Sequence, residues 1–455
     1  MKGAVSFQPA DGATELDPAQ AEVLVKPSGG DASLKSVTVQ ADGGDAVPST
    51  LDGGRLSIKP GTLKTDSRYV ITAVATVNHR DAPATEETQT SAFSTATTPH
   101  VVATNPLSVG PNQSVVVMLQ PAAGAVDVEG PVRSELGPDG LTITVVPETF
   151  KQGETYSFSV TAKNRKGIAG TPQSISFNTL PPATAEVYPG RGSTNMGVAI
   201  PMTLTLSAPP ADKSDFVTHL AVTASAAPPP ATGTGSCAGF GNPAVSAGSV
   251  PVSFSWTTDR RVRLTPKTPD GYWPAKSTIA VSARLSGVQT TAGNVFASDI
   301  NSSFVTADKR VIDVDLTNQR LTACRNGVQD RQFLISSGAV AHPTYTGTFY
   351  IYSRVADEEM KSPEGPFAPD YYDIKHVPWT QYFDGGAALH GAWWHNNFGH
   401  PMSHGCVNVQ TPTENKQWPK ATPEAEYLWN FDYLGDPVIV HGVTPGLAAS
   451  AQPSD

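Results

Sequence analysis

The protein is a chain of 455 residues, long enough for three or four domains. Glycine and proline contribute 40 residues each and charged side chains only 16%, which, with frequent Thr, Ser and Val, is typical of all-β folds. The formal net charge of −10 argues against a nucleic-acid partner and gives no reason to expect attraction to an anionic membrane surface.

Three stretches ahead of residue 308 repeat one pattern. In each, a proline and a polar turn precede an aromatic residue, and an alternating strand then closes on a Phe-x-Thr ending. Short strands separated by turn signals roughly every 8–12 residues favour β-sandwiches. The repeats resemble bacterial Ig-like domains. Their endings are Phe93-Ser94-Thr95, Phe177-Asn178-Thr179 and Phe304-Val305-Thr306.

The third repeat is longer than the others because it contains a Pro/Ala/Gly-rich insertion, about Ala208 to Val250. This composition predicts a long surface loop. The chain has three cysteines, too few for a disulfide framework. Cys324 is expected on a strand as an ordinary apolar residue. We expect no bond between it and Cys237, which lies in the insertion.

The last part of the chain begins with alternating strands and a two-residue hairpin signal at Asn326-Gly327. The segment from Ala356 to His376 is rich in proline and predicts a loop or lid. Thr411 to Glu414 fits a capping box followed by a helix through about Trp418. The remaining expectations are a short helix over Glu424 to Phe431, a strand over Asp436 to His441 that closes the sheet, and a disordered tail.

The stretch from Gly385 to Val409 concentrates reactive side chains. It holds His390, His395, His400, His404 and Cys406. A free thiol with a pKa of about 8.5 is mostly protonated at neutral pH, so it needs a base to become a nucleophile. An imidazole within hydrogen-bond reach can take that proton and return it to a leaving amine. A glycine beside the cysteine lets backbone N–H groups approach an oxyanion. The stretch therefore predicts cysteine-based acyl transfer.

The spacing of these residues resembles the active-site signature of L,D-transpeptidases of the YkuD type, which remodel bacterial peptidoglycan. The signature begins with His390-Gly391. The twelve residues from Gly391 to Met402 then lead to Ser403-His404-Gly405-Cys406. The resemblance implies that Cys406 is the nucleophile, that His390 is the base and that the Gly391 carbonyl orients the imidazole. Ser403, His404 and Gly405 would line the same turn.

The resemblance also implies substrate-binding residues. A lid tyrosine contributes to the oxyanion site in relatives, and Tyr371 or Tyr372 could match it. Many relatives have an arginine two residues after the cysteine, but Asn408 stands there in this chain, so an arginine clamp for a carboxylate is not expected. Trp393 and Trp394 are candidates for a substrate wall or for the core.

The predicted fold class is therefore mainly β, with three tandem Ig-like β-sandwich domains followed by a β-rich YkuD-type catalytic domain that has one or two short helices. The expected ranges are 1–98, 99–181 and 182–307 for the Ig-like domains, 308–445 for the catalytic domain and 446–455 for the tail. The Ig-like repeats are expected to act as a stalk; a carbohydrate- or protein-binding role is the alternative.

The resemblance implies attack on a peptidoglycan stem peptide, release of D-Ala and formation of a 3→3 cross-link, without a metal or organic cofactor. Water as acceptor would make the enzyme an L,D-carboxypeptidase. Carbapenems and other β-lactams are the expected covalent inhibitors. Such an enzyme must be exported to the cell wall or periplasm, although residues 1–18 show no signal segment or membrane anchor. Two rivals are a zinc peptidase built on the histidines, which lack an HExxH motif, and a non-catalytic wall-binding protein.

Overall fold

The computed structural model describes residues 4–52, 55–58, 61–80, 82–111, 113–146, 150–225, 231–362, 365–367, 369–411 and 424–455. The chain divides into two compact units. One comprises Met1–Pro182 with Ala292–Asn294, and the other comprises Ala183–Thr291 with Val295–Asp455. In the parts described, no helix has the length and apolar character needed to span a bilayer.

The first unit contains two sets of β-sheets. In the first set, a four-stranded sheet in the order β2-β8-β7-β4 accompanies the pairs β1-β3 and β5-β6. The strand β7 buries every second residue, as its alternating sequence requires. The bounds are β1 (Val5–Gln8), β2 (Ala13–Leu16), β3 (Leu24–Pro27), β4 (Ala32–Ala41), β5 (Thr50–Asp52), β6 (Arg55–Ser57), β7 (Arg68–Val77) and β8 (Thr85–Thr95).

The second set is a sandwich of two four-stranded sheets, β10-β16-β15-β12 and β13-β14-β11-β9. Its core gathers Phe150, Tyr156 and Phe177, whose rings lie 4.2 to 5.8 Å apart. The bounds are β9 (His100–Asn105), β10 (Ser108–Val109), β11 (Val115–Gln120), β12 (Ala125–Glu129), β13 (Arg133–Leu136), β14 (Thr142–Val146), β15 (Thr155–Lys163) and β16 (Gln173–Thr179).

The second unit opens with a sandwich of the sheets β17-β19-β23-β22 and β18-β25-β24-β20-β21. Its strands and helices are β17 (Ala185–Tyr188), β18 (Ser193–Met196), β19 (Met202–Leu206), α1 (Lys213–Thr218), β20 (Leu220–Ala224), η1 (Gly235–Phe240), β21 (Gly248–Ser249), β22 (Val252–Thr258), β23 (Arg261–Pro266), β24 (Thr278–Ala283) and β25 (Ile300–Thr306).

The repeated Phe-x-Thr ending has the same structural role in all three sets of sheets. Thr95, Thr179 and Thr306 are buried, and each hydroxyl donates to a main-chain carbonyl, at 2.7, 2.6 and 2.6 Å respectively. Each hydroxyl also accepts a backbone N–H from the residue immediately before the preceding hairpin strand, at 3.1, 2.9 and 2.9 Å. The repeat therefore marks a recurring hydrogen-bonded corner, which explains why the pattern is detectable in the sequence.

The insertion of the third repeat is not simply a long surface loop, so that expectation was wrong. Asp212 caps α1 by accepting from the N–H groups of Ser214 and Asp215. Phe216, on the same helix, is completely buried, and β20 pairs with both β24 and β21. The Pro/Gly content obscured one buried aromatic and one short alternating strand, which together attach the insertion to the sandwich core.

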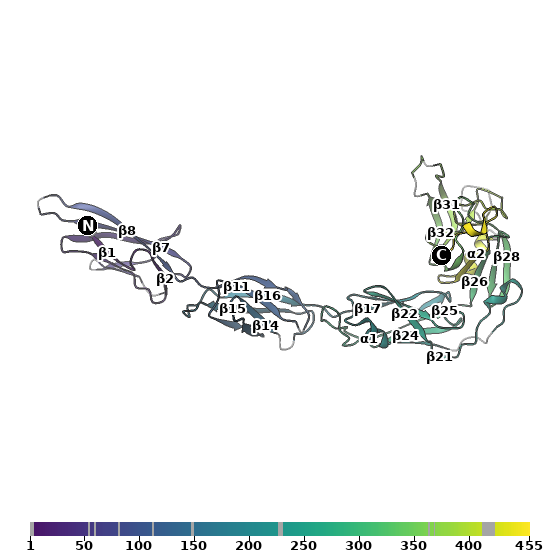
Figure 1. The fold of residues 1–455 in the computed structure, drawn as a ribbon, viewed down its shortest axis with the longest axis horizontal. Coiled ribbons are helices and arrows are strands. Elements are labelled where there is room, and N and C mark those ends of the chain that lie inside the picture. Colours follow the sequence, from purple (N-terminus) through teal and green to yellow (C-terminus); the bar gives the residue numbers. More distant parts are fainter. Residues whose placement is uncertain are drawn as a thin grey trace. The chain divides into compact units, whose positions relative to one another are not determined.

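The rest of the second unit is built on a nine-stranded sheet with the order β29-β34-β26-β27-β28-β33-β32-β31-β30, in which Figure 1 labels β26, β28, β31 and β32. Helix α2 (Ala425–Phe431) packs against its core through Leu428 and Phe431. The strands are β26 (Arg310–Asp315), β27 (Arg320–Arg325), β28 (Val328–Ser336), β29 (Gly347–Tyr350), β30 (Ser353–Lys361), β31 (Asp373–Asp384), β32 (Ala387–Ala392), β33 (Val407–Gln410) and β34 (Pro437–His441). The short helix predicted over 424–431 is confirmed, whereas the one predicted from 411 to 418 lies outside the described residues, except for Thr411.

Two expectations about irregular segments need correction. The segment from Ala356 to His376 is only partly a loop, because both of its ends are strands: β30 and β31 pair up to Lys361 and Asp373. The tail after residue 445 is not disordered. It forms the short helix η2 (Ala449–Ala451), and Gln452 donates from Nε2 to the Thr344 carbonyl at 2.8 Å. Specific hydrogen bonds of this kind order a terminus whose composition alone predicts disorder.

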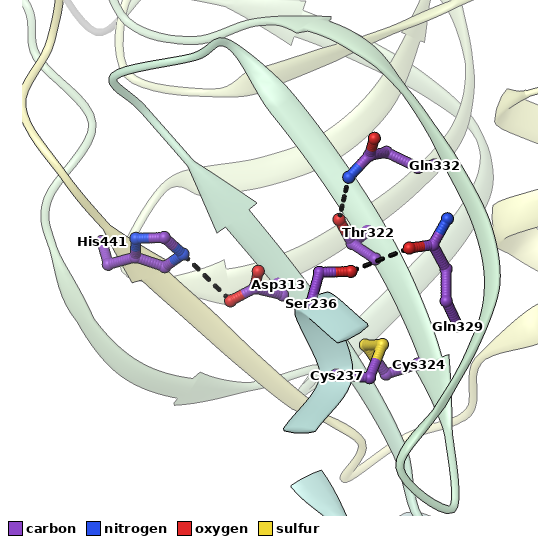
Figure 2. Close-up of a disulfide and its surroundings, with 8 residues drawn as sticks. All are labelled: Ser236, Cys237, Asp313, Thr322, Cys324, Gln329, Gln332 and His441. Atoms are coloured by element: carbon purple, nitrogen blue, oxygen red, sulfur yellow. Dashed lines mark hydrogen bonds and ion pairs between the residues drawn. A yellow bond between two sulfur atoms is a disulfide. The ribbon is translucent and has the colours of Figure 1, made fainter. Parts of the chain in front are cut away.

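A disulfide joins Cys237 of the insertion to Cys324 of β27 (Figure 2). Its Cα atoms are 5.8 Å apart, and both side chains are completely buried. Ser236 donates to Gln329 beside it at 2.8 Å. The expectation that these cysteines stay unpaired was therefore wrong: a bond between a short helix and a strand, 87 positions apart, has no signature in local sequence.

Further contacts inside the second unit join its sandwich to the nine-stranded sheet. The Lys309 ammonium is buried and pairs with Asp270 at 2.9 Å. The N–H groups of Gly197 and Ala199 donate to the carbonyls of Leu434 and Gly435 at 2.7 and 2.8 Å. The sandwich and the nine-stranded sheet are thus connected by hydrogen bonds, a buried ion pair and a disulfide.

Candidate active site

Two neighbouring parallel strands place the central side chains of the site. β32 and β33 pair so that His390 lies beside Asn408. Cys406 directly precedes β33, two residues before Asn408. Residues two apart on a strand point to the same face. His390, Asn408 and Cys406 therefore share one face of the sheet, and all three line a cavity of about 130 Å³.

His390 is a buried, oriented imidazole. Its Nδ1 lies 3.2 Å from the Gly391 carbonyl oxygen, which can only accept, so Nδ1 carries the proton and donates. Nε2 is then left with a lone pair. Burial lowers the pKa of His390 to about 4, against the opposing effect of the Gly391 hydrogen bond. The side chain is therefore neutral at pH 7 and can act as a base.

Cys406 carries the single free thiol of the chain and is partly exposed. Burial of its sulfur raises the pKa of Cys406 to about 11, while a hydrogen bond from the backbone of Ala388 opposes that rise. The resting pair is thus a neutral thiol and a neutral imidazole. Such a pair can form the thiolate during attack, as the proton passes to His390 and negative charge moves onto the substrate oxygen.

The turn before Cys406 is held by side-chain hydrogen bonds. The Ser403 hydroxyl donates to the Cys406 carbonyl and accepts from the Gly405 N–H at 3.1 Å. Thr344 donates to the Gly405 carbonyl at 2.9 Å. Gly405 has φ = +119°, a conformation that residues with a side chain rarely adopt. Ser403 and Gly405 therefore shape the nucleophile turn, and Thr344 is a supporting residue that the motif does not include.

Cys406 borders two hollows. Besides the cavity that it shares with His390, it lines an open cleft of about 770 Å³. Tyr372 and His404 also line both. Gly386, whose carbonyl accepts from the Cys406 thiol at 3.9 Å, and Asp455 of the tail also line the cleft. The tail thus contributes to the surroundings of the nucleophile, a role that its composition did not indicate.

The structure distinguishes between the paired aromatic candidates. Tyr372 lines both hollows and its ring lies 5.0 Å from that of His404, whereas the Tyr371 hydroxyl donates to Asp373 at 3.2 Å and lines neither. Trp394 lines the cavity and stacks on His390 at 5.7 Å. Trp393 lines neither hollow and donates to the His376 carbonyl at 3.3 Å.

Asn408 is oriented by His395. The Asn408 Nδ2 lies 2.9 Å from the His395 Nε2, and the Asn397 N–H lies 3.3 Å from the Nδ1 of the same ring. Burial lowers the pKa of His395, which favours the neutral ring. The Asn408 Oδ1 is buried without a hydrogen-bond partner in the described part of the chain. The sequence contains no signal for this pair, because it depends on a loop folding back onto β33.

The histidines considered as zinc ligands do not converge. His395 bonds Asn408, His400 is exposed, and His390 faces Cys406 across the cavity. Across the described ranges, the one group of three side chains with metal-ligand spacing consists of His342, Asp370 and His404. The geometry on which a zinc peptidase would depend is therefore absent from His390, His395 and His400.

A neutral thiol and an oriented neutral imidazole on a β-sheet, beside a glycine-containing turn, are the parts that cysteine acyl transfer requires. Residues 309–440 match the family model described as the L,D-transpeptidase catalytic domain, and residues 122–233 match the model of a bacterial Ig domain. Residues 309–440 are therefore similar to the YkuD-type L,D-transpeptidase catalytic domain, and part of the chain ahead of them is similar to a bacterial Ig domain. The Ig match extends across parts of the second and third sets of sheets.

The individual proteins that the chain is similar to are named L,D-transpeptidases. L,D-transpeptidase 5 of Mycobacterium tuberculosis is 26% identical over 318 residues, which cover 66% of this chain and 60% of that protein. A solved L,D-transpeptidase from Mycobacterium smegmatis is 24% identical with a TM-score of 0.40, covering 57% of this chain and all of the other. L,D-transpeptidase 3 from Mycobacterium tuberculosis, solved with a faropenem-derived adduct, is 22% identical with a TM-score of 0.40, covering 56% and 97%.

Proposed function

We propose that the protein is a peptidoglycan L,D-transpeptidase that works through a thioester on Cys406 and forms 3→3 cross-links between stem peptides. The observation that carries this proposal is the common face of His390, Asn408 and Cys406 around one cavity. The match of residues 309–440 to the catalytic-domain family supports the same substrate class.

In the acylation half-reaction, a tetrapeptide stem occupies the cleft with the carbonyl of its third residue, typically meso-diaminopimelate, next to Cys406. The thiol proton passes to Nε2 of His390 as sulfur bonds to the carbonyl carbon. The tetrahedral intermediate collapses by breaking the C–N bond to the terminal D-Ala. His390 returns the proton to the leaving amine, and a thioester remains.

In the second half-reaction, the side-chain amine of a neighbouring stem attacks the thioester carbonyl. His390 takes a proton from that amine and delivers it to the departing sulfur, which restores the thiol. Water in place of the amine gives an L,D-carboxypeptidase. The Gly391 carbonyl keeps the same imidazole nitrogen available in both steps because it holds the proton on Nδ1.

Hydrogen-bond donors and aromatic side chains around the thiol would bind the substrate. Asn408, at the position where an arginine stands in many relatives, lines the cavity with an uncharged amide that can hydrogen-bond to a substrate without supplying charge. Tyr372 can donate from the lid side, since it lines both hollows. Trp394 forms an apolar wall of the cavity and limits the rotation of His390.

The location we propose is outside the cytoplasm, at the cell wall. The Cys237–Cys324 disulfide supports export, because such bonds persist mainly in oxidising compartments. The three sets of sheets ahead of residue 308 would serve as a stalk that carries the catalytic sheet into the wall. Carbapenems would acylate the same thiol: sulfur bonds to the strained ring carbonyl, the ring C–N bond breaks and the nitrogen receives the proton.

The test is mass spectrometry of muropeptides incubated with the purified chain. We expect loss of D-Ala from disaccharide-tetrapeptides and the appearance of 3→3 dimers, both absent with Cys406→Ala. Tripeptides without dimers would identify the carboxypeptidase instead. An unchanged muropeptide profile would favour a non-catalytic wall-binding protein, and turnover that survives Cys406→Ala would exclude the cysteine mechanism.

A further inference from the structure

A second cluster of functional side chains lies at the mouth of the cleft. His342, Asp370 and His404 place their ligand atoms within 4.8 Å of one another. The His342 Nε2 is 3.5 Å from Asp370 Oδ2, and the rings of His342 and His404 are stacked with centroids 4.9 Å apart. The acyl-transfer steps proposed above use none of these three side chains as an acid, base or nucleophile.

The three side chains come from three different segments. His342 belongs to the loop after β28, Asp370 to the tip of the β30–β31 hairpin, and His404 to the nucleophile turn. Two imidazoles and one carboxylate form a donor set used for Zn²⁺ and similar divalent ions, with a position left open for water. Other histidine–carboxylate pairs in the described part, such as His441 with Asp313, have no second histidine within ligand spacing.

The two histidines are held close together by the backbone. The loop after β28 forms a bridge between Gly338 and Ser403, and the Ala339 N–H donates to the Ser403 carbonyl at 2.8 Å. Thr344 at the other end of that loop donates to the Gly405 carbonyl. His342 and His404 thus extend from two segments that hydrogen bonds join on both sides, which preorganises two of the three ligands.

The third ligand is supplied by the lid and can move. In a tetrahedral zinc site with Zn–N distances near 2.0–2.1 Å, neighbouring ligand atoms are about 3.4 Å apart, so the cluster must contract by roughly 1 Å to hold an ion. The side chains of His342 and Asp370 are 39% and 67% exposed, and such side chains can rotate to make this adjustment. Electrostatics favours the contraction, because Asp370 supplies a negative charge to the ion.

We propose that His342, Asp370 and His404 bind a divalent transition-metal ion, with Zn²⁺ as the probe, and that the ion ties the lid to the nucleophile turn. Asp370 is two residues from Tyr372, and His404 is two residues from Cys406. An ion between them closes the lid tip over the mouth of the cleft. Binding therefore slows acylation of Cys406; this second consequence rests on the function proposed above.

Binding is tested by titrating the full chain with Zn²⁺ alone, in competition with a chromophoric chelator. We expect one equivalent to bind, with affinity reduced roughly tenfold or more in His342→Gln and in Asp370→Asn. Cys406→Ser keeps the site, which distinguishes it from a metal–thiol adduct. His441→Gln is the matched control, since its histidine also pairs with a carboxylate, as Figure 2 shows, and it should bind as the wild type does.

No stoichiometric binding, or binding lost only in Cys406→Ser, would overturn the site. The effect on the lid is measured by following acylation with a carbapenem by intact mass, with and without Zn²⁺. We expect Zn²⁺ to slow the wild type at least several-fold and Asp370→Asn far less. Equal inhibition of both would contradict the lid closure. Absence of acylation in metal-free wild type would instead refute the proposed function and leave the zinc titration unaffected.

Discussion

Removal of the Cys237–Cys324 disulfide should destabilise the second unit more than removal of any single contact. The bond closes a loop of 87 residues. In the chain-entropy description, a loop of that length restricts the unfolded chain by about 4.6 kcal/mol at 25 °C, and measured effects commonly fall between about 2 and 5 kcal/mol. The paired variant Cys237→Ala/Cys324→Ala should therefore lose several kcal/mol of unfolding free energy.

Tryptophan fluorescence is the appropriate assay for this change. All seven tryptophans lie between Trp256 and Trp429, so their emission during urea unfolding reports on the second unit and not on the first. Every sample carries Cys406→Ala, which removes the thiol that could exchange with the disulfide. This parent variant is the control, and it should contain no titratable thiol when denatured.

Two outcomes would refute the reasoning about the disulfide. Two reactive thiols in the denatured parent would show that the bond does not form. A decrease in unfolding free energy of less than about 1 kcal/mol, with the bond shown to be present in the parent, would mean that it barely restricts the unfolded chain. Intermediate values would be read against the slope of the transition, since a change in that slope indicates a more compact denatured state.

The remaining predictions concern the site. His390→Gln should reduce acylation by roughly 10²–10⁴-fold in single-turnover measurements, whereas His400→Gln should stay near wild type; similar losses in both would refute the base assignment. Because burial lowers the pKa of His390 to about 4, the acid limb of acylation should lie well below pH 6.5, and a midpoint near 6.5 would contradict a buried neutral base. Between about pH 4 and 6.5, the unfolded chain binds a proton on His390 and the folded chain does not. Part of the unfolding free energy should therefore be lost as pH falls through that window. Matched urea titrations should show no such loss in His390→Gln. Tyr372→Phe should slow acylation more than Tyr371→Phe, because only the former lines the hollows; the reverse order would show that the lid adopts another arrangement during reaction.

Features with a local pattern were predictable from the sequence. Strand alternation and the Phe-x-Thr corners are patterns that repeat along the chain, and the spacing from His390 to Cys406 lies within one short stretch of sequence. The parallel register of β32 and β33 then brings the two ends of the motif together. The short helix at 424–431 was equally accessible, because Leu428 and Phe431 form an apolar stripe of helical spacing.

Features that depend on distant contacts were not predictable. The Cys237–Cys324 bond, the docked tail and the contact between His395 and Asn408 each involve at least one segment whose own residues suggest loop or disorder. The strands at both ends of the predicted lid were missed because the prolines between them indicate a loop. The contact between Asn408 and His395 therefore could not be inferred from the motif alone.

The central claim is that Cys406 is the residue that becomes acylated. The most direct measurement is intact-mass analysis of the chain after incubation with a carbapenem, followed by mapping of the modified peptide. We expect a single adduct on the peptide that contains Cys406, and none in Cys406→Ala. An adduct on the Cys237 or Cys324 peptide, or an unmodified wild-type chain under conditions in which it is folded, would contradict the account.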